Sequence, residues 1–351
     1  MVSRPARLTP PVECVRLFDA ASGLDGVIAI HSTALGPGAG GCRLWSYDDM
    51  DAALADALRL AEGMSYKNAL AGLPFGGAKA VLRRPAGDFD RAALFRAFGE
   101  VVERLGGLYV TAEDVGTSVD DMHEVARVSR HVAGLHAKDG RAGGDPSPWT
   151  ALGVFEAMRA AARFALGSEL EGLTVAVQGT GNVGADLCRR LAGAGAKLVI
   201  ADPNPDRRDR LAHVHDARVV GVDEIALADA DIFAPCALGG ALDRDTVKRM
   251  KARLVCGAAN NQLATPDVAA LLLDRGIAYA PDYVVNAGGI INVSAEYLGE
   301  DEASVAARVA GIAPRVADIL RVAREEERSP AAVADEMAEA VIAGAQRAVA
   351  A

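Results

Sequence analysis

The sequence lacks any run of about 18 apolar residues, the length that a transmembrane helix needs. Its first residues, MVSRPARLTPPVE, carry positive charge, but no apolar stretch follows them, so we expect no signal peptide. Positive charge is also scarce overall, since the formal net charge is −10. This acidic balance argues against a nucleic-acid backbone or an anionic membrane as the main partner.

Cysteine is rare as well. The five cysteines are odd in number and scattered, and they form no C-x-x-C pair. This pattern predicts neither a disulfide framework nor a zinc site, and it is typical of small buried residues in a reducing cytosol. His213 and His215 have a spacing that suits a metal ion, but no acidic or cysteine cluster accompanies them. We therefore expect a soluble, cytoplasmic protein without a metal site.

Hydrophobic residues are plentiful, at 51% of the 351 residues, which allows full-sized cores. At roughly 150 residues per domain, this length predicts two domains. In the second half, short β-branched runs alternate with segments of helical spacing, which predicts βαβ units and a parallel sheet. These runs are LTVAVQ from Leu173, KLVIA from Lys197, and the segments that start at Asp231, Arg253 and Ile277.

The first half has a mixed α/β pattern. VIAIHST from Val27 and LYVTAED from Leu108 are typical of strands. DAALADALRLAEGM from Asp51 and residues 90–105 have the spacing of amphipathic helices. We therefore predict a mixed α/β domain for this half.

A Gly-Gly-Asp-Pro loop separates the two halves. Ser147 is the predicted N-cap of the helix that follows, and Pro148 is its predicted first residue. We predict a first domain over residues 1–140 and a second over 148–329. Residues 141–147 between them are predicted to lead into a hinge. A second Ser-Pro start signal predicts a terminal helix over 330–351, so apolar that it must pack on the first domain or on another subunit.

The pattern G-x-G-x-x-G follows the first predicted strand of the second domain and opens a helix. The first glycine permits a tight turn, the second lets the backbone approach a pyrophosphate, and the third allows close packing of helix on strand. The helix N-terminus offers unpaired N–H groups to the phosphates. The predicted coenzyme-binding residues of this loop are Gly179, Thr180, Gly181, Asn182, Val183 and Gly184.

Asp202 ends the next predicted strand, eighteen residues past the last glycine. Its carboxylate would accept hydrogen bonds from the ribose hydroxyls and repel a 2′-phosphate, which favours NAD over NADP. Arg207 and Arg208 argue the other way, since arginines can bind that phosphate. A methyltransferase that uses S-adenosylmethionine could carry a related loop, but it would not explain the lysines of the first half.

Two lysines, Lys67 and Lys79, stand in the otherwise apolar and glycine-rich segment YKNALAGLPFGGAKAV. Lysine is rarely buried without a partner. One lysine can hold a substrate carboxylate, and the other, desolvated beside a second cation, can have a pKa low enough for acid–base work near neutral pH. With Asp114 to receive an ammonium group, the set suits an amino acid whose Cα hydrogen faces a nicotinamide. The alternative is a solvated loop with two surface charges.

Seven ordered segments resemble the Glu/Leu/Phe/Val dehydrogenase family, and in particular its leucine, valine and phenylalanine branch. They are LGPGAGGCRLW, MSYKNALAGLPFGGAKAV, TAEDVGT, GDPSPWTALGV, VQGTGNVG, GAANNQL and APDYVVNAGGIINV. The resemblance implies an N-terminal domain that binds substrate and forms a homo-oligomer, a C-terminal Rossmann domain that binds NAD, and a catalytic cleft between them. It also implies reversible, NAD-dependent oxidative deamination of an apolar L-amino acid to the 2-oxo acid and ammonia.

The same resemblance assigns roles to single residues. Lys79 would be the catalytic lysine that activates the water which hydrolyses the imine, and Asp114 the acid that exchanges protons with the amine. Lys67 would fix the substrate carboxylate, helped by the backbone near Gly40. The remaining implied positions are Asn261 at the substrate, and Thr150 and Asn286 around the nicotinamide. The intact lysines and acid argue against an inactive, NAD-binding regulatory protein.

The implied pocket for the substrate side chain is lined by Ala39, Ala112, Ile290 and Val293. Leucine-type members usually carry a larger aliphatic residue where Ala39 stands, so leucine or valine and phenylalanine all stay open as substrates. Two other positions depart from the family pattern. Ala78 replaces a glycine and could shift the loop before Lys79, and Asp145 replaces an asparagine in the hinge loop.

Overall fold

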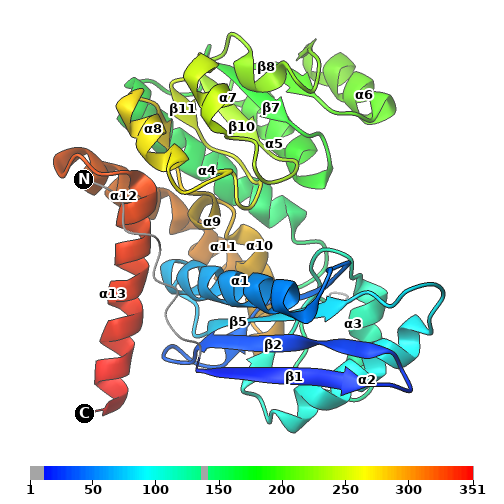
Figure 1. The fold of residues 1–351 in the computed structure, drawn as a ribbon. Coiled ribbons are helices and arrows are strands. Elements are labelled where there is room, and N and C mark those ends of the chain that lie inside the picture. Colours follow the sequence, from blue (N-terminus) through cyan, green and yellow to red (C-terminus); the bar gives the residue numbers. More distant parts are fainter. Residues whose placement is uncertain (1–11, 136–140, 351) are drawn as a thin grey trace. The chain divides into compact units, whose positions relative to one another are not determined.

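The computed structural model describes residues 12–135 and 141–350 (Figure 1). Contacts between residues divide the chain into two compact units. Among the described residues, the first unit comprises 12–135, 141–144, 292–305 and 338–350, and the second comprises 145–291 and 306–337. Each unit combines a six-stranded sheet with helices, so the fold is the two-domain α/β fold that the sequence predicts.

The sheet of the first unit has the strand order β1-β2-β5-β3-β6, and β4 also pairs with β5. β1 and β2 form an antiparallel hairpin and β2 is antiparallel to β5, whereas the other pairings are parallel. Its strands are β1 (Glu13–Asp19), β2 (Leu24–Ser32), β3 (Gly38–Ala39), β4 (Cys42–Trp45), β5 (Gly76–Arg83) and β6 (Tyr109–Val110). Its helices include α1 (Met50–Leu70), α2 (Arg91–Arg104) and α3 (Val119–Ala126).

Side chains along β5 alternate between two cores, because successive residues of a strand point to opposite faces. Ala78, Ala80 and Leu82 lie in a large apolar cluster with residues of α2 and α3. Val81 instead packs against small alanines of α1. α1 therefore covers one face of the sheet, and α2 and α3 cover the other (Figure 1). Ala78 belongs to the strand, with its methyl group buried in the core, and not to a loop.

The second unit contains a wholly parallel sheet with the strand order β12-β11-β10-β7-β8-β9. This is the doubly wound order of a Rossmann domain, and the direction of winding reverses between β7 and β10. Its strands are β7 (Thr174–Gln178), β8 (Lys197–Ala201), β9 (Arg218–Val219), β10 (Ile232–Pro235), β11 (Leu254–Val255) and β12 (Ala278–Tyr279). The carboxyl ends of β7 and β10 therefore mark where a ligand is expected.

Helices cover this sheet, and the longest is α4 (Ser147–Leu166). Ser147 is the first helical residue and not the N-cap, which is Pro146. Asp145, the residue before the N-cap, accepts a hydrogen bond on its Oδ1 from the Ser147 N–H at 2.9 Å, which satisfies the first N–H of the helix. The others include α5 (Asn182–Gly193), α6 (Pro205–His215), the 3₁₀ helix η1 (Ile225–Leu227), α7 (Arg244–Arg249), α8 (Val268–Asp274), α9 (Asp282–Val285) and α12 (Ile312–Glu325).

Three helices contribute residues to both units: α10 (Gly288–Leu298), α11 (Glu302–Ala310) and α13 (Pro330–Ala350). The second part of α13 packs within the first unit, where Glu339 accepts a hydrogen bond from the Tyr66 hydroxyl of α1 at 2.9 Å. Its first part belongs to the second unit, where Asp335 accepts one from the Tyr283 hydroxyl at 2.8 Å. No helix in the described part of the chain is long and apolar enough to cross a membrane.

Candidate active site

Lys79 lies in the middle of β5, on the face that α1 covers. Gly77, two residues earlier, shares that face and lies very close to the helix. A Cβ at Gly77 would stand 2.1 Å from the backbone nitrogen of Ser65. Lys79 itself is only 5% exposed. An ammonium group at this depth loses most of its hydration and needs a charged partner.

Asp114 is that partner. It follows β6 in the loop before α3, and its Oδ2 lies 3.0 Å from Lys79 Nζ. The same oxygen accepts a hydrogen bond from Arg43 Nε, also at 3.0 Å. Thr117 fixes the loop, because its Oγ1 accepts a hydrogen bond from the Asp114 N–H at 2.8 Å. The two predicted catalytic residues are therefore in direct contact, and a second cation joins them.

Burial lowers the pKa of the Lys79 ammonium below its ordinary value of 10.5, and the Arg43 charge lowers it further, although Asp114 opposes the shift. For Asp114, burial alone would raise the pKa of the carboxyl. The charges of Lys79 and Arg43 outweigh burial and hold that pKa below its ordinary value of 3.8. At neutral pH the aspartate is thus ionised, and Lys79 releases its proton more readily than a lysine in water.

The other predicted substrate-side residues of the first unit lie on neighbouring elements. Lys67 is in the last turn of α1 and is partly buried. Ala39 on β3 and Gly40 directly after it are buried. A Cβ at Gly40 would stand 1.8 Å from the carbonyl oxygen of Ala78, so only glycine lets this segment approach β5 so closely. Ala112 follows β6, the strand that pairs with β3, and is 9% exposed.

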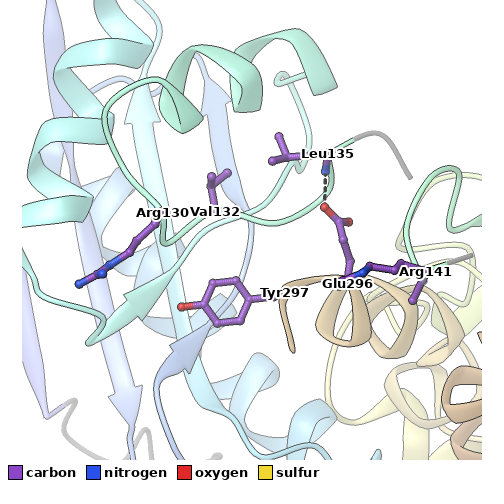
Figure 2. Close-up of a pocket in the computed structure, with 7 residues that line it drawn as sticks. Arg130, Val132, Leu135, Arg141, Glu296 and Tyr297 are labelled. Atoms are coloured by element: carbon purple, nitrogen blue, oxygen red, sulfur yellow. Dashed lines mark hydrogen bonds between the residues drawn. The ribbon is translucent and has the colours of Figure 1, made fainter. Parts of the chain in front are cut away.

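Val293 lies on α10 and is partly buried. Other side chains of α10 border a pocket of about 230 Å³ (Figure 2). It is lined by Arg130, Val132, Leu135, Arg141, Ala142, Glu296 and Tyr297. Figure 2 shows Glu296 pointing to the backbone of Leu135, whose N–H donates to its Oε1 at 2.9 Å. The pocket contains none of the predicted catalytic residues, and its hydrogen bonds hold α10 against the chain that follows α3.

In the second unit, the glycine-rich loop joins β7 to α5 at the point where the winding of the sheet reverses. Gly179 has a φ of +94°, a conformation that favours glycine. A Cβ at Gly184 would stand 2.0 Å from the Gly179 carbonyl oxygen, so the third glycine permits α5 to pack on the strand. A Cβ at Gly181 would meet no atom within 4 Å, so the space beside the second glycine is open.

Further features of this loop fit a dinucleotide. Asn182 and Val183 form the first turn of α5, which no side chain caps, so its N–H groups can bind phosphate oxygens. Thr180 is 3% exposed, and no group in the described residues bonds to its buried Oγ1. An open glycine, an uncapped helix start and an unpaired hydroxyl are what a bound pyrophosphate would use.

Asp202, at the end of β8, closes the same site. Its Oδ2 accepts a hydrogen bond from the Thr180 N–H at 2.7 Å, and its Oδ1 accepts one from the Asn204 N–H at 2.8 Å. Burial would raise the pKa of this carboxyl, but those hydrogen bonds lower it below its ordinary value. Arg207 Nη2 lies 3.5 Å from Oδ1. The carboxylate is therefore ionised and fixed beside the glycine-rich loop.

The remaining predicted residues of the second unit are spread over several elements. Asn286, after α9, is buried and donates to the 258–260 loop, while no described group bonds to its Oδ1. Thr150 lies in the first turn of α4. Asn261 is exposed and has a φ of +52°. Ile290 lies on α10 and is partly buried. The unpaired amide oxygen of Asn286 is a further atom that a bound nicotinamide could engage.

Family patterns match most of the chain. The pattern of the Glu/Leu/Phe/Val dehydrogenase dimerisation domain matches residues 13–131, and that of Glutamate/Leucine/Phenylalanine/Valine dehydrogenase matches residues 206–351. The chain belongs to this family. The NAD-binding domain pattern of D-isomer specific 2-hydroxyacid dehydrogenases also matches, over residues 153–255.

Individual relatives of this amino-acid dehydrogenase agree. Leucine dehydrogenase of Bacillus subtilis (strain 168) is 45% identical over 92% of this chain and 88% of its own. Valine dehydrogenase of Streptomyces virginiae is 49% identical over 92% of this chain and 90% of its own. Among solved structures, L-tryptophan dehydrogenase from Nostoc punctiforme superposes with a TM-score of 0.86 at 37% identity, over 96% of this chain and 97% of that one. The protein is an NAD-dependent amino-acid dehydrogenase with a Rossmann domain.

One residue of the candidate site of this dehydrogenase does not stand out in the sequence. It is Arg43, in the segment GCRLW. It bonds both Asp114 and Asp56 of α1, at 3.0 Å and 2.9 Å. The available signal was a charged residue in an apolar strand pattern, the same signal that singled out Lys79. In the described part of the chain, no group of three His, Cys, Asp or Glu side chains is placed to hold a metal ion.

Proposed function

We propose that the enzyme catalyses the reversible oxidative deamination of an apolar L-amino acid of the leucine or valine type, giving the 2-oxo acid and ammonia. The buried contact between Lys79 and Asp114 carries this proposal, because it joins a lysine of lowered pKa to an ionised acid. The leucine and valine dehydrogenases among the relatives support the substrate class.

The residues take separate parts in this reaction. Lys67 holds the substrate carboxylate, and Asp114 accepts a hydrogen bond from the α-amino group. Bound NAD supplies the hydride acceptor for Cα, which leaves an iminium on the substrate. Neutral Lys79 takes a proton from the water that attacks the iminium carbon, and the tetrahedral carbinolamine then loses ammonia. Asp114 relays the proton that the leaving amine needs.

Other residues would hold the coenzyme and the substrate side chain. The loop from Gly179 to Gly184 and Asp202 would bind the pyrophosphate and ribose of NAD, with Thr150 and Asn286 at the nicotinamide. The substrate side chain would contact an apolar set, and Asn261 would contact the substrate as well. That apolar set is Ala39, Ala112, Ile290 and Val293.

A panel of L-amino acids tests the substrate class. NADH formation is followed at alkaline pH with leucine, valine, phenylalanine and tryptophan. We expect kcat/KM for leucine or valine to exceed that for phenylalanine by about tenfold or more, since each methylene that fits or misfits an apolar pocket changes binding by about 1–3 kcal/mol. Phenylalanine is the second candidate, because the buried Ala39 leaves room for a larger side chain. No turnover with any amino acid would refute the proposed function.

Lys79→Ala tests the assignment of the catalytic lysine. We expect the variant to lose at least about a hundredfold in kcat, the low end of what general acid–base catalysis supplies, while NADH still binds, because the coenzyme loop lies in the other unit. Lys251→Ala, at an exposed lysine, is the matched control and should keep full activity. Turnover that survives in Lys79→Ala would remove this residue from the mechanism.

We also propose a homo-oligomer in the cytoplasm. The matched family pattern over residues 13–131 is described as a dimerisation domain, which supports the oligomer. All five cysteines are free thiols, which supports a reducing compartment. Light scattering on the purified enzyme would give the mass directly, and a mass of one chain would contradict the oligomer.

A further inference from the structure

Arg43 connects the catalytic pair to helix α1. Its Nε donates to Asp114 Oδ2 at 3.0 Å, and its Nη1 donates to Asp56 Oδ2 at 2.9 Å. The Arg43 side chain is 18% exposed. A guanidinium group is planar and carries its donors in fixed directions, so two bonds to two acids fix its orientation, which an ammonium group would not achieve.

Asp56 is itself held in place. Tyr47 donates its hydroxyl to Asp56 Oδ2 at 2.6 Å, and Arg59 Nη2 donates to Oδ1 at 2.7 Å. Both oxygens of the carboxylate are thus engaged, and its side chain is 17% exposed. Arg43 therefore reaches Asp114 from a fixed anchor rather than from a mobile side chain.

The anchor stands on the same helix as the predicted carboxylate-binding lysine. Asp56 and Lys67 are eleven residues apart on α1. At 3.6 residues per turn this is about three full turns, so the two residues lie on one stripe of the helix, roughly 16 Å apart. The helix that carries Lys67 thus also fixes the orientation of Arg43, and through Arg43 that of Asp114.

We propose that Arg43 is a positioning residue for the catalytic pair and that Asp56 orients it. This inference rests on the proposed function. Arg43 and Lys79 share Asp114 Oδ2, so the described bonds of that carboxylate leave Oδ1 to accept from the substrate ammonium. Arg43 also places a permanent positive charge beside Lys79, which favours the neutral amine that the reaction requires.

Several ionisable groups stand on the elements around Lys79. On β4 and in the loop after β6 they are Cys42, Arg43, Glu113 and Asp114, on β2 there is His31, and on α1 there are Asp56, Glu62 and Lys67. His31 faces Glu62, with Nε2 to Oε1 at 3.8 Å. Asp114, Arg43 and Cys42 are the groups whose charges act on Lys79. Only Arg43 among these three is a cation, so removing it must raise the pKa of Lys79.

The test compares Arg43→Gln with Asp56→Asn, two variants that break the same bond. The pH profile of kcat for oxidative deamination is measured at saturating amino acid and NAD, where it reports the enzyme–substrate complex. In Arg43→Gln the positive charge is lost, so we expect the limb that rises with pH to move to higher pH by about 0.5–1 unit. In Asp56→Asn the charge of Arg43 is less compensated, so the limb should move to lower pH.

The size of the loss gives a second readout. We expect kcat of Arg43→Gln to fall about 10- to 100-fold, as misplacement of reacting groups by about 1 Å does. Arg43→Lys keeps the positive charge but loses the planar guanidinium with its fixed donor directions. Relative to Arg43→Gln, it should return the limb to the wild-type pH and recover only part of kcat. Shifts of the same sign in Arg43→Gln and Asp56→Asn, or losses without any shift, would show that Arg43 is only a structural brace and overturn the proposal.

The control is Arg83→Gln, which removes an arginine–aspartate bond on β5, the strand that carries Lys79. Arg83 Nη1 donates to Asp25 Oδ2 at 3.0 Å, away from the catalytic pair. In this variant, the rising limb of the kcat profile should stay at the pH of the wild-type limb. The Nζ resonance of Lys79 in lysine-labelled protein, assigned with Lys79→Arg, measures its pKa without turnover. If the wild-type enzyme has no activity, the proposed function is refuted. The positioning role is judged separately, because shifts of the Lys79 resonance in opposite directions in Arg43→Gln and Asp56→Asn would still support it.

Discussion

At the scale of single residues, the network around Asp202 underlies the proposed preference for NAD. Hydrogen bonds from two backbone N–H groups keep its carboxylate ionised, despite burial, and fix it at the end of β8. A 2′-phosphate placed there would meet a negative charge that cannot rotate away. The Nη2 atom of the neighbouring Arg207 lies 3.5 Å from Asp202 Oδ1, so the carboxylate offsets part of the charge of this arginine.

Asp202→Asn should therefore weaken the preference for NAD. The amide removes the repulsion and leaves Arg207 available to a phosphate, so we expect the ratio of kcat/KM for NAD to that for NADP to fall about 10- to 100-fold, a change of roughly 1.4–2.7 kcal/mol. Initial rates with both coenzymes measure the ratio. Asp206→Asn, at an exposed position on α6, is the control. An unchanged ratio in Asp202→Asn would mean that another group excludes NADP.

Single residues also show where sequence reasoning ends. The positions of Lys79 and Asp202 stand out in the sequence because each lies inside a local pattern, an apolar segment or a strand end after a glycine loop. The role of Arg43 could not be predicted, because its partners lie 71 and 13 residues away along the chain. Those contacts arise from how β4, α1 and the loop after β6 pack, and no spacing in the sequence encodes that packing.

At the scale of elements, the approach of α1 to β5 is set by small residues. Gly77 lies against Ser65, and a Cβ there would stand 2.1 Å from a backbone nitrogen. Backbone atoms cannot move aside as a flexible side chain does. Since Lys79 shares this face, the spacing between strand and helix also determines how deeply the lysine is buried.

Gly77→Ala should thus be strongly destabilising, whereas Gly63→Ala should not. We expect Gly77→Ala to lower the free energy of unfolding by roughly 3 kcal/mol, as overpacking of a tight core does. A Cβ at Gly63, in the exposed middle of α1, meets no atom within 4 Å. That variant should gain about 0.5–1 kcal/mol from helix propensity. Denaturant unfolding measures both, and equal stability of the two variants would contradict this account of the interface.

Elements were predicted with uneven success for physical reasons. KLVIA from Lys197 to Ala201 is β8 in full, because a buried parallel strand bounded by turns is a strong local signal. The predicted helix from Asp51 runs on to Leu70 and includes Lys67. The residues beyond the predicted segment, 65–70, include several polar side chains, so the apolar spacing that indicates a helix is weaker there.

At the scale of the whole molecule, α13 is fastened by two similar hydrogen bonds. Tyr66 donates to Glu339 in the first unit, and Tyr283 donates to Asp335 in the second. Tyr66 directly precedes Lys67, and Tyr283 lies three residues before Asn286. The first bond therefore restrains the chain beside the proposed carboxylate-binding lysine, and the second restrains the chain near the proposed nicotinamide-binding asparagine.

Tyr66→Phe and Tyr283→Phe should separate these two effects. A net hydrogen bond contributes about 0.5–1.5 kcal/mol, and we expect only part of it to reach the ligand. Tyr66→Phe should raise KM for the amino acid about two- to threefold and leave KM for NAD unchanged, whereas Tyr283→Phe should do the reverse. Steady-state kinetics with both substrates varied checks this, and an equal effect of both variants on one constant would argue against it.

The compact units of the structure divide the chain at other places than the predicted domains do. The predicted second domain included residues 292–305, whose contacts place them in the first unit. The cause is local bonding from α10, such as that of Glu296 to the N–H groups of Gly134 and Leu135. The bounds of the substrate and coenzyme domains as functional parts remain a prediction.

The bond between Tyr66 and Glu339 spans 273 residues of sequence, and this separation has a consequence for biosynthesis. At roughly 5–20 residues per second, a ribosome needs about 15–55 seconds to make the intervening chain. The strands of both sheets, which end at Val110 in the first unit and at Tyr279 in the second, are all synthesised before α13. Tyr66 and its neighbour Lys67 therefore wait through the synthesis of the whole second sheet before the segment of α13 that packs on α1 exists, and the first unit completes its packing only then.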